Sequence, residues 1–194
     1  MSENLKIKTI GNRISIAESY SNDNKIWSLV ILPYIDKWRY WALIAWVIAW
    51  TVCGILIISS YKLTTTNEQK LFIIVFVVFW LYYEWKMIQI FRWRKWGKEK
   101  LWIKNNELFY EESILKKSKT FKWKIEHINE VAIEEFNEKS FTDFISNSFW
   151  NKGKPRIRIN VLGKNYYLGY QLNDNEVVPI VKSLKHQLNS ILKN

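Results

Sequence analysis

The sequence predicts an α+β membrane protein, in which a hairpin of two transmembrane helices accompanies a small antiparallel β-module closed by a C-terminal amphipathic helix. Three observations support this class: an uncharged apolar run at residues 41–60, short runs after residue 97 that alternate apolar with polar residues, and helical spacing of apolar residues near the C-terminus. We expect three parts: an N-terminal cytoplasmic β-hairpin segment (1–37), the helix hairpin (38–96, with helices at about 38–60 and 71–96) and a cytoplasmic β-module (97–194).

The composition limits the classes of function. The 194 residues include 29 Lys+Arg against 18 Asp+Glu, a formal net charge of +11, and 48% are hydrophobic, so the chain is not disordered throughout. A single cysteine, Cys53, excludes an internal disulfide framework and a cysteine-built zinc site. The six glycines form no nucleotide-binding fingerprint. We therefore expect no cofactor.

The first apolar run, WALIAWVIAWTVCGILIISS at residues 41–60, contains no charged residue. As a helix it is about 30 Å long, which matches the hydrocarbon core of a bilayer. A soluble helix of this length would show a polar face, and this run offers only Thr51, Ser59 and Ser60. It is too long, and starts too far along the chain, for a cleaved signal peptide. We expect a transmembrane helix rather than a buried core helix.

The second apolar run is shorter. Residues 71–83 (LFIIVFVVFWLYY) are fully apolar, and the helix reaches spanning length only by continuing through residue 91. Glu84 and Lys86 then fall near one end, where long side chains reach the headgroups. Because residues 61–70 form a short link, the two helices are predicted to run antiparallel.

The cations that flank the two runs predict an orientation. Six precede the first run, two lie in the link and seven follow the second run, so the positive-inside rule places both termini in the cytoplasm. We expect a multi-pass inner-membrane protein whose cytoplasmic interface is formed by aromatic and cationic side chains: Trp38, Arg39, Trp41, Trp85, Arg92, Trp93, Arg94, Lys95 and Trp96. The basic stretch at 86–104 adjoins a membrane helix and alternates with Trp, which favours membrane lipids over nucleic acid as its partner.

Short strands are predicted on both sides of the helix hairpin. Residues 5–10 and 13–16 alternate across Gly11-Asn12 and predict a β-hairpin, which we expect to pack on other strands because a lone hairpin is marginal in water. Further strand-like runs follow at residues 101–103, 108–110, 120–125, 128–133, 156–161 and 166–170. Their short turns predict an antiparallel sheet or an open barrel.

The C-terminal residues predict one amphipathic helix. Apolar residues recur there at spacings of four and three, as on one helix face: Val177, Val181, Leu184, Leu188 and Ile191. Asn173 or Asp174 can cap this helix, and Pro179 is tolerated because it lies in the first turn. We expect the apolar face to cover the open end of the barrel.

Four stretches together suggest a known architecture: the basic Trp-rich exit at 92–97 (RWRKWG), residues 121–131, residues 156–170 and the terminal helix. A meandering β-module closed by one C-terminal helix resembles the pleckstrin-homology (PH) architecture. With its helix pair, the chain is similar to bacterial membrane proteins that carry a transmembrane helix pair and a PH-like domain. It also resembles, in the order of its parts, the photosystem I assembly factor family of cyanobacteria and chloroplasts. The resemblance implies a PH-like fold and a membrane-anchored scaffold, and transfers no residue roles.

Residues 137–155 do not fit a minimal PH-like module. The stretch Ser140-Phe-Thr-Asp143 resembles a capping box, and aromatic residues gather on one side of a helical projection: Phe141, Phe144, Phe149 and Trp150. This face either packs on the barrel or forms an exposed patch that binds a partner or the membrane.

No residue pattern in the chain indicates catalysis. The two histidines, His127 and His186, lack metal-ligand spacing and neighbour no nucleophile motif. Glu84 is the strongest single functional candidate, because an acid near the membrane is usually paired or used. An ion pair with a nearby cation such as Arg92 is the simpler explanation. We expect no enzyme and no metal site.

Two functions from different classes fit the sequence. The first is a non-enzymatic scaffold that binds a protein partner, a second copy of itself or anionic lipid at the inner face of the membrane. The second is a two-helix effector whose cytoplasmic β-barrel senses a signal nucleotide and permeabilises the membrane. Under the second, the ligand contacts are two cations and two aromatic rings: Arg156, Arg158, Tyr166 and Tyr170. If the protein is a scaffold, these four residues are the solvent-facing side of two strands. The C-terminal helix favours the scaffold, because it would plug the barrel mouth that a ligand needs.

Overall fold

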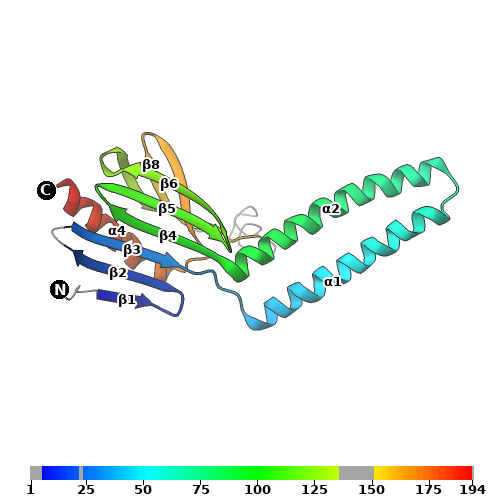
Figure 1. Ribbon diagram of the computed structural model, residues 1–194, viewed down its shortest axis with the longest axis horizontal. Coiled ribbons are helices and arrows are strands. Elements are labelled where there is room, and N and C mark those ends of the chain that lie inside the picture. The colour runs from blue at the N-terminus through cyan, green and yellow to red at the C-terminus, as the bar shows by residue number, and fades with distance from the viewer. Residues whose placement is uncertain (1–5, 22–23, 136–150, 194) are drawn as a thin grey trace. The chain divides into compact units, whose positions relative to one another are not determined.

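The computed structural model describes residues 6–21, 24–135 and 151–193 and divides the chain into two compact units (Figure 1). The β-unit combines Met1–Tyr34 with Trp96–Asn194, and the helical unit is Ile35–Lys95. The class is α+β, with two long apolar helices and antiparallel sheets, as the sequence predicts. Instead of three successive parts, the strands before and after the helices form one unit.

The helical unit is a hairpin of α1 (Lys37–Ser60) and α2 (Asn67–Trp96), joined through the short 3-10 helix η1 (Tyr61–Leu63). Both helices are long and apolar enough to cross a membrane. In the most apolar window of each helix only 11% is buried, whereas the core helix of a soluble protein is mostly buried.

A close contact between Gly54 and Trp80 holds the two helices together. The Trp80 indole donates a hydrogen bond to the Trp50 carbonyl oxygen at 3.1 Å. A Cβ atom at Gly54 would lie 2.1 Å from the Trp80 ring, so this approach requires glycine. Nearby, the Thr51 hydroxyl donates to the Glu84 carboxylate at 2.7 Å, and Glu84 is 9% exposed. Glu84 therefore serves the contact between the helices, and no ion pair with Arg92 is found among the described residues.

The larger sheet of the β-unit has six antiparallel strands in sequence order (Figure 1). They are β1 (Lys6–Ile10), β2 (Ile14–Ser21), β3 (Asn24–Ile31), β4 (Gly97–Lys104), β5 (Glu107–Ile114) and β6 (Lys117–Lys124). The predicted N-terminal hairpin is confirmed as β1 and β2, and it does pack on other strands. Strand β3 follows no pattern that predicted a strand from the sequence. This strand pairs with β4, with Leu29 opposite Leu101, so the helical unit is an insertion between two neighbouring strands.

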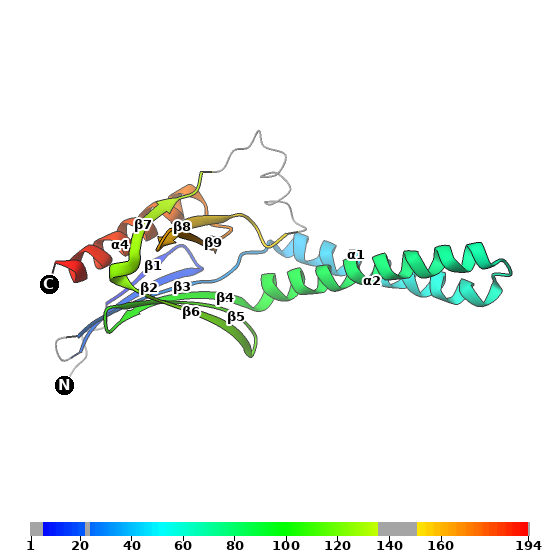
Figure 2. The same ribbon diagram turned by 90° about the horizontal axis from the view of Figure 1, so that it is seen from above.

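The smaller sheet has three antiparallel strands and follows the 3-10 turn η2 (Ile125–His127). Its strands are β7 (Ile128–Ile133), β8 (Pro155–Val161) and β9 (Lys164–Tyr170), and helix α4 (Asp174–Leu192) packs on β7 and β8 (Figure 2). The two sheets and α4 share one core, in which Leu29, Leu101, Ile157 and Leu184 are fully buried.

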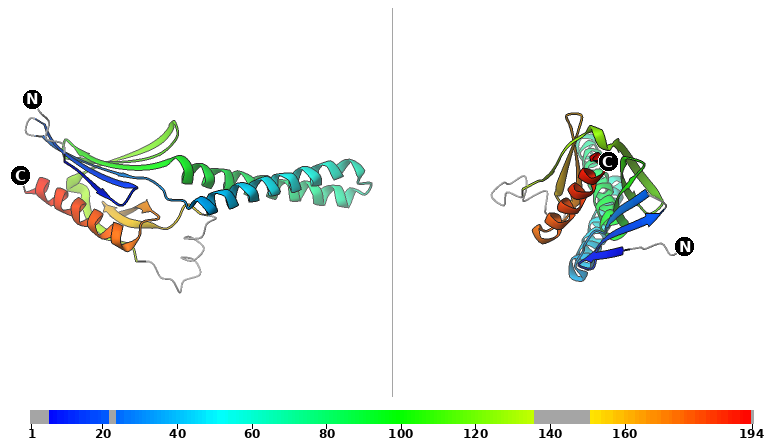
Figure 3. Two further views of the ribbon diagram at one scale, coloured as in Figure 1. Left: turned by 90° about the horizontal axis from the view of Figure 1, so that it is seen from below. Right: turned by 90° about the vertical axis from the view of Figure 1, so that its left-hand side faces the viewer.

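Helix α4 contacts both sheets (Figure 3). Its predicted apolar face is confirmed, because Val177, Val181, Leu184 and Leu188 are buried in the core. Toward the larger sheet, the Trp27 indole donates to the Ser183 hydroxyl at 3.2 Å, and the Gln187 amide donates to the Glu18 carboxylate at 3.0 Å. The helix therefore closes the gap between the sheets along β2 and β3.

The start of α4 is tied to the β1–β2 turn by an ion pair that predicts an acid-sensitive contribution to stability. Arg13 Nε donates to Glu176 at 2.9 Å, and the Asn173 N–H donates to the same carboxylate at 2.9 Å. Burial raises the pKa of Glu176, but these hydrogen bonds outweigh it and leave the pKa lowered. The stabilisation is therefore present above the unfolded pKa and is lost as the pH falls through the lower native pKa.

We expect Arg13→Ala to remove this pH-dependent contribution to the free energy of unfolding. In urea titrations of the full chain in detergent at a series of pH values below 5, the wild type should lose stability more steeply than the variant. Lys8→Ala, an exposed cation on β1, is the matched control and should follow the wild type. Equal slopes for wild type and Arg13→Ala would contradict this role.

Candidate functional site

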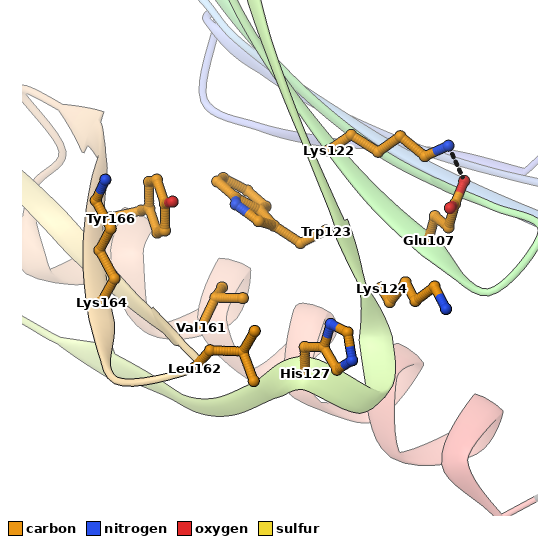
Figure 4. A pocket seen from close by; sticks show the side chains of 9 residues that line it. All are labelled: Glu107, Lys122, Trp123, Lys124, His127, Val161, Leu162, Lys164 and Tyr166. Carbon is orange, nitrogen blue, oxygen red and sulfur yellow. Dashed lines mark ion pairs between the residues drawn. The ribbon is translucent and has the colours of Figure 1, made fainter.

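A pocket of about 530 Å³ opens between the edge strands of the two sheets (Figure 4). This volume is in the range of small-molecule sites. Side chains from β5, β6, η2, β9 and the β8–β9 turn line it: Glu107, Lys122, Trp123, Lys124, His127, Val161, Leu162, Lys164 and Tyr166. No described residue of α4 is among them.

Local backbone geometry brings these side chains together. Glu107 is opposite Lys124 in the β5–β6 ladder, and the chain then turns through η2, which places His127 beside the end of β6. From the other sheet, Val161 and Lys164 are paired across a two-residue turn formed by Leu162 and Gly163. Tyr166 follows on β9, two residues after Lys164.

Leu162 occupies an unusual place in this turn. Its φ is 50° and that of Gly163 is 82°, as two-residue hairpin turns require, but glycine or asparagine is the usual residue at the first position. A leucine there is strained, and this one is also 70% exposed. The pocket therefore presents an exposed apolar side chain at a strained backbone position.

The charges of the lining are mostly positive. Three lysines and one carboxylate, Glu107, line the pocket, and Glu107 pairs with Lys122 at 2.9 Å. Lys124 pairs loosely with the exposed Glu126 at 3.5 Å. Lys164 lies over the Tyr166 ring, 5.4 Å from its centroid, and no carboxylate pairs with it within the described part of the chain. The lining can therefore compensate negative charge on a ligand.

Aromatic rings form the wall of the pocket. The Trp123 and Tyr166 ring centroids are 4.7 Å apart, and Phe121 lies 5.9 Å from Trp123. Figure 4 shows both pocket rings above Val161 and Leu162, with the two lysines of β6 beyond them. The wall is rigid because Trp123 is 7% exposed and packed in the core.

A second polar cluster lies inside the β-unit, away from the pocket. Glu99 on β4 is 2% exposed and accepts hydrogen bonds from the Tyr110 hydroxyl at 3.0 Å and from the N–H groups of Gly169 and Tyr170 at 2.7 and 2.9 Å. Burial raises the pKa of Glu99 although these hydrogen bonds lower it. Burial and the charges of Glu112 and Glu99 raise the pKa of Tyr170 to about 12. The cluster joins β4 to β9, so its role is to connect the two sheets.

The four predicted ligand contacts do not form one site. Arg156 pairs with Asp174 and donates to the Glu134 carbonyl at 2.9 Å, and Arg158 pairs with Glu134 at 2.7 Å. Tyr170 belongs to the Glu99 cluster. Of the four, Tyr166 alone lines the pocket. Sequence reasoning missed the β6 lysines, Trp123 and Leu162, although the alternation of cations and rings at 121–124 and 164–166 was visible.

The predicted interface residues differ in exposure. Trp38, Trp41 and Trp85 are 69%, 66% and 63% exposed, as an interfacial belt requires, whereas Trp93 and Arg94 are buried. Arg39 pairs with Asp36 at 3.3 Å, and Lys95 donates to the Tyr40 hydroxyl at 2.8 Å. Arg92 and Trp96 complete the end of α2. The candidate partner-binding residues Phe141, Phe144, Phe149 and Trp150 lie outside the described residues.

Comparisons with known proteins give no relative from which a role could be transferred: no family model, curated protein or solved structure matches the chain. Within the described ranges, no group of three or more His, Cys, Asp or Glu side chains could hold a metal ion. The pocket, with its cationic and aromatic lining, is the candidate functional site of the β-unit.

Proposed function

We propose that this chain is a non-enzymatic, membrane-anchored binding module, with a PH-like β-unit at the cytoplasmic face of the inner membrane. The observation that carries the proposal is the insertion of the helical unit between paired strands β3 and β4. An anchor inserted in this way enters and leaves the sheet on two neighbouring strands, unlike an anchor on a terminal linker. The β-unit is thus held at the membrane by two connections.

The exposed apolar surface of both helices supports the anchor, and the flanking cations support an orientation with both termini in the cytoplasm. Two antiparallel sheets closed by α4 support the PH-like interpretation. The expected partners are membrane lipids and, because the chain acts as a scaffold, either another protein or a second copy of this chain. The exposed Trp38, Trp41 and Trp85 fit contact with headgroups.

Single-cysteine labelling tests the anchor and its orientation. In a Cys53→Ala background, Thr65→Cys lies in the link between the helices and Lys193→Cys lies at the exposed C-terminus. We expect a membrane-impermeant maleimide to label Thr65→Cys in intact cells, and Lys193→Cys only after permeabilisation, with the protein resistant to alkaline carbonate extraction. Release by carbonate, or labelling of Lys193→Cys in intact cells, would overturn the proposed anchor or its orientation.

The pocket favours the second candidate function, an effector that senses a signal nucleotide. The objection to that function is that the terminal helix plugs the barrel. In the described structure α4 closes the side along β2 and β3, while the pocket opens between β6 and β9. A ligand can therefore enter without moving α4.

A further inference from the structure

We propose that the pocket between β6 and β9 binds a small organic phosphate, in which a phosphorylated end is joined to a ring, as in a nucleoside diphosphate. This inference rests on the proposed binding function and names the ligand class and its residues. The lining combines cationic side chains from both sheets with aromatic and aliphatic side chains, and a ligand of this class matches both kinds.

The cations of the lining are Lys122 and Lys124 on β6 and Lys164 on β9, and Glu107 is its single carboxylate (Figure 4). Glu107 pairs with Lys122 at 2.9 Å, and Glu126 reaches Lys124 only at 3.5 Å with both side chains more than 60% exposed. A solvent-exposed pair of this kind is weak, so a phosphate competes readily with it. Lys164, over Tyr166, is placed to hold a second negative charge.

The aromatic and aliphatic residues of the lining favour a ligand that carries more than a simple anion. Leu162 is strained in its turn and 70% exposed, and the Tyr166 ring stands beside that of Trp123 on the wall of the pocket. An exposed leucine at a position that favours glycine or asparagine gains nothing for folding. In the pocket, Leu162 adds an apolar surface that the ring of a ligand can contact.

Within the β-unit, the pocket lies at the end of β4 and β5 that is remote from Gly97. Glu107 is opposite Lys104, seven residues after Gly97, the first residue after α2. Seven residues of strand span roughly 24 Å. A soluble phosphate and the phosphate of a lipid headgroup offer this pocket the same anionic chemistry, so the experiment must distinguish the two sources.

Calorimetric titration of the full chain in phosphatidylcholine nanodiscs tests the proposal, with ADP and UDP as probes. We expect both to bind, and adenosine and pyrophosphate to bind at least ten-fold more weakly because each offers one half of the ligand. The pair Lys124→Gln and Lys164→Gln should weaken ADP binding at least ten-fold. Lys182→Gln with Lys185→Gln, the same charge change on the exposed face of α4, should leave it unchanged.

The strained leucines provide a second, fold-independent comparison. Leu115 has a φ of 54° and is 56% exposed in the β5–β6 turn, but it does not line the pocket. Asparagine suits both positions, so Leu162→Asn and Leu115→Asn should both fold and raise thermal stability. Leu162→Asn should weaken ADP binding at least three-fold, whereas Leu115→Asn should not.

Three results would overturn the proposal: no binding of ADP or UDP, equal loss in the pocket and control variants, or binding of pyrophosphate as tight as that of ADP. Signals that appear only when phosphatidylglycerol replaces phosphatidylcholine, without nucleotide, would instead assign the pocket to a lipid headgroup. None of these results changes the outcome of the cysteine-labelling test, so failure of this ligand assignment is distinguishable from failure of the membrane anchor.

Discussion

Replacing Glu99 with alanine is expected to lower the free energy of unfolding of the β-unit by about 3–5 kcal/mol, because it removes the acceptor for three buried donors. The N–H groups of Gly169 and Tyr170 and the Tyr110 hydroxyl would lose their partner in a site that is 2% exposed. Urea denaturation of the full chain in detergent, followed by near-UV circular dichroism, measures the loss. Hydrogen exchange at residues 167–172 should accelerate in the same variant.

The pH dependence of stability gives a second readout for Glu99. Because its pKa is raised in the native state, its contribution is fully present below the unfolded pKa and is lost as the pH rises through the native pKa. This slope is opposite to that of Glu176 and should be absent in Glu99→Ala. Glu126→Ala, which removes an exposed acid, is the control and should change stability by less than about 1 kcal/mol. An unchanged urea midpoint for Glu99→Ala would contradict the connecting role.

Gly54→Leu is expected to separate α1 from α2 and to destabilise the helical unit by about 3 kcal/mol or more, because the new side chain must occupy the volume of the Trp80 ring. The Trp80 hydrogen bond to the Trp50 carbonyl would be lost with it. Thermal unfolding of the full chain in detergent, followed by far-UV circular dichroism, measures the effect. Cys53→Leu adds similar bulk at the neighbouring exposed position and should be tolerated.

A double-mutant cycle separates steric conflict from general damage to the helix. Trp80→Ala makes room for a side chain at position 54, so Gly54→Ala should cost less in the Trp80→Ala background than in the wild type. Additive effects of the two substitutions would mean that Gly54 and Trp80 do not constrain each other.

The helices and the apolar face of α4 could be predicted because their signals are local. The uncharged run at 41–60 and the three-and-four spacing of Val177, Val181, Leu184 and Leu188 require no knowledge of distant residues. The pairing of β3 with β4 could not be predicted in this way. The whole helical unit separates these strands in the chain, and no short-range pattern records which strand will lie beside β3.

Glu99 and the pocket show two different limits of prediction from the sequence. Glu99 lies between Lys98 and Lys100 and resembles part of a solvated charged run. However, it is two residues before Leu101 and four before Ile103, so it lies on the same inward face of the strand. This alternation was a signal from which its burial could have been predicted. No sequence signal of comparable strength predicted the pocket, because its two walls come from the edges of different sheets. The order of residues in the sequence does not reveal that β6 and β9 approach each other.

The insertion of the helices between β3 and β4 also sets an order of assembly. The first three strands leave the ribosome before any of β4 has been synthesised, and both long helices must be made in between. Until then β3 is an open strand edge, able to pair with the wrong chain. Completion of the six-stranded sheet is therefore delayed until both helices have been translated, and the β-unit cannot finish folding before the helical unit has been made.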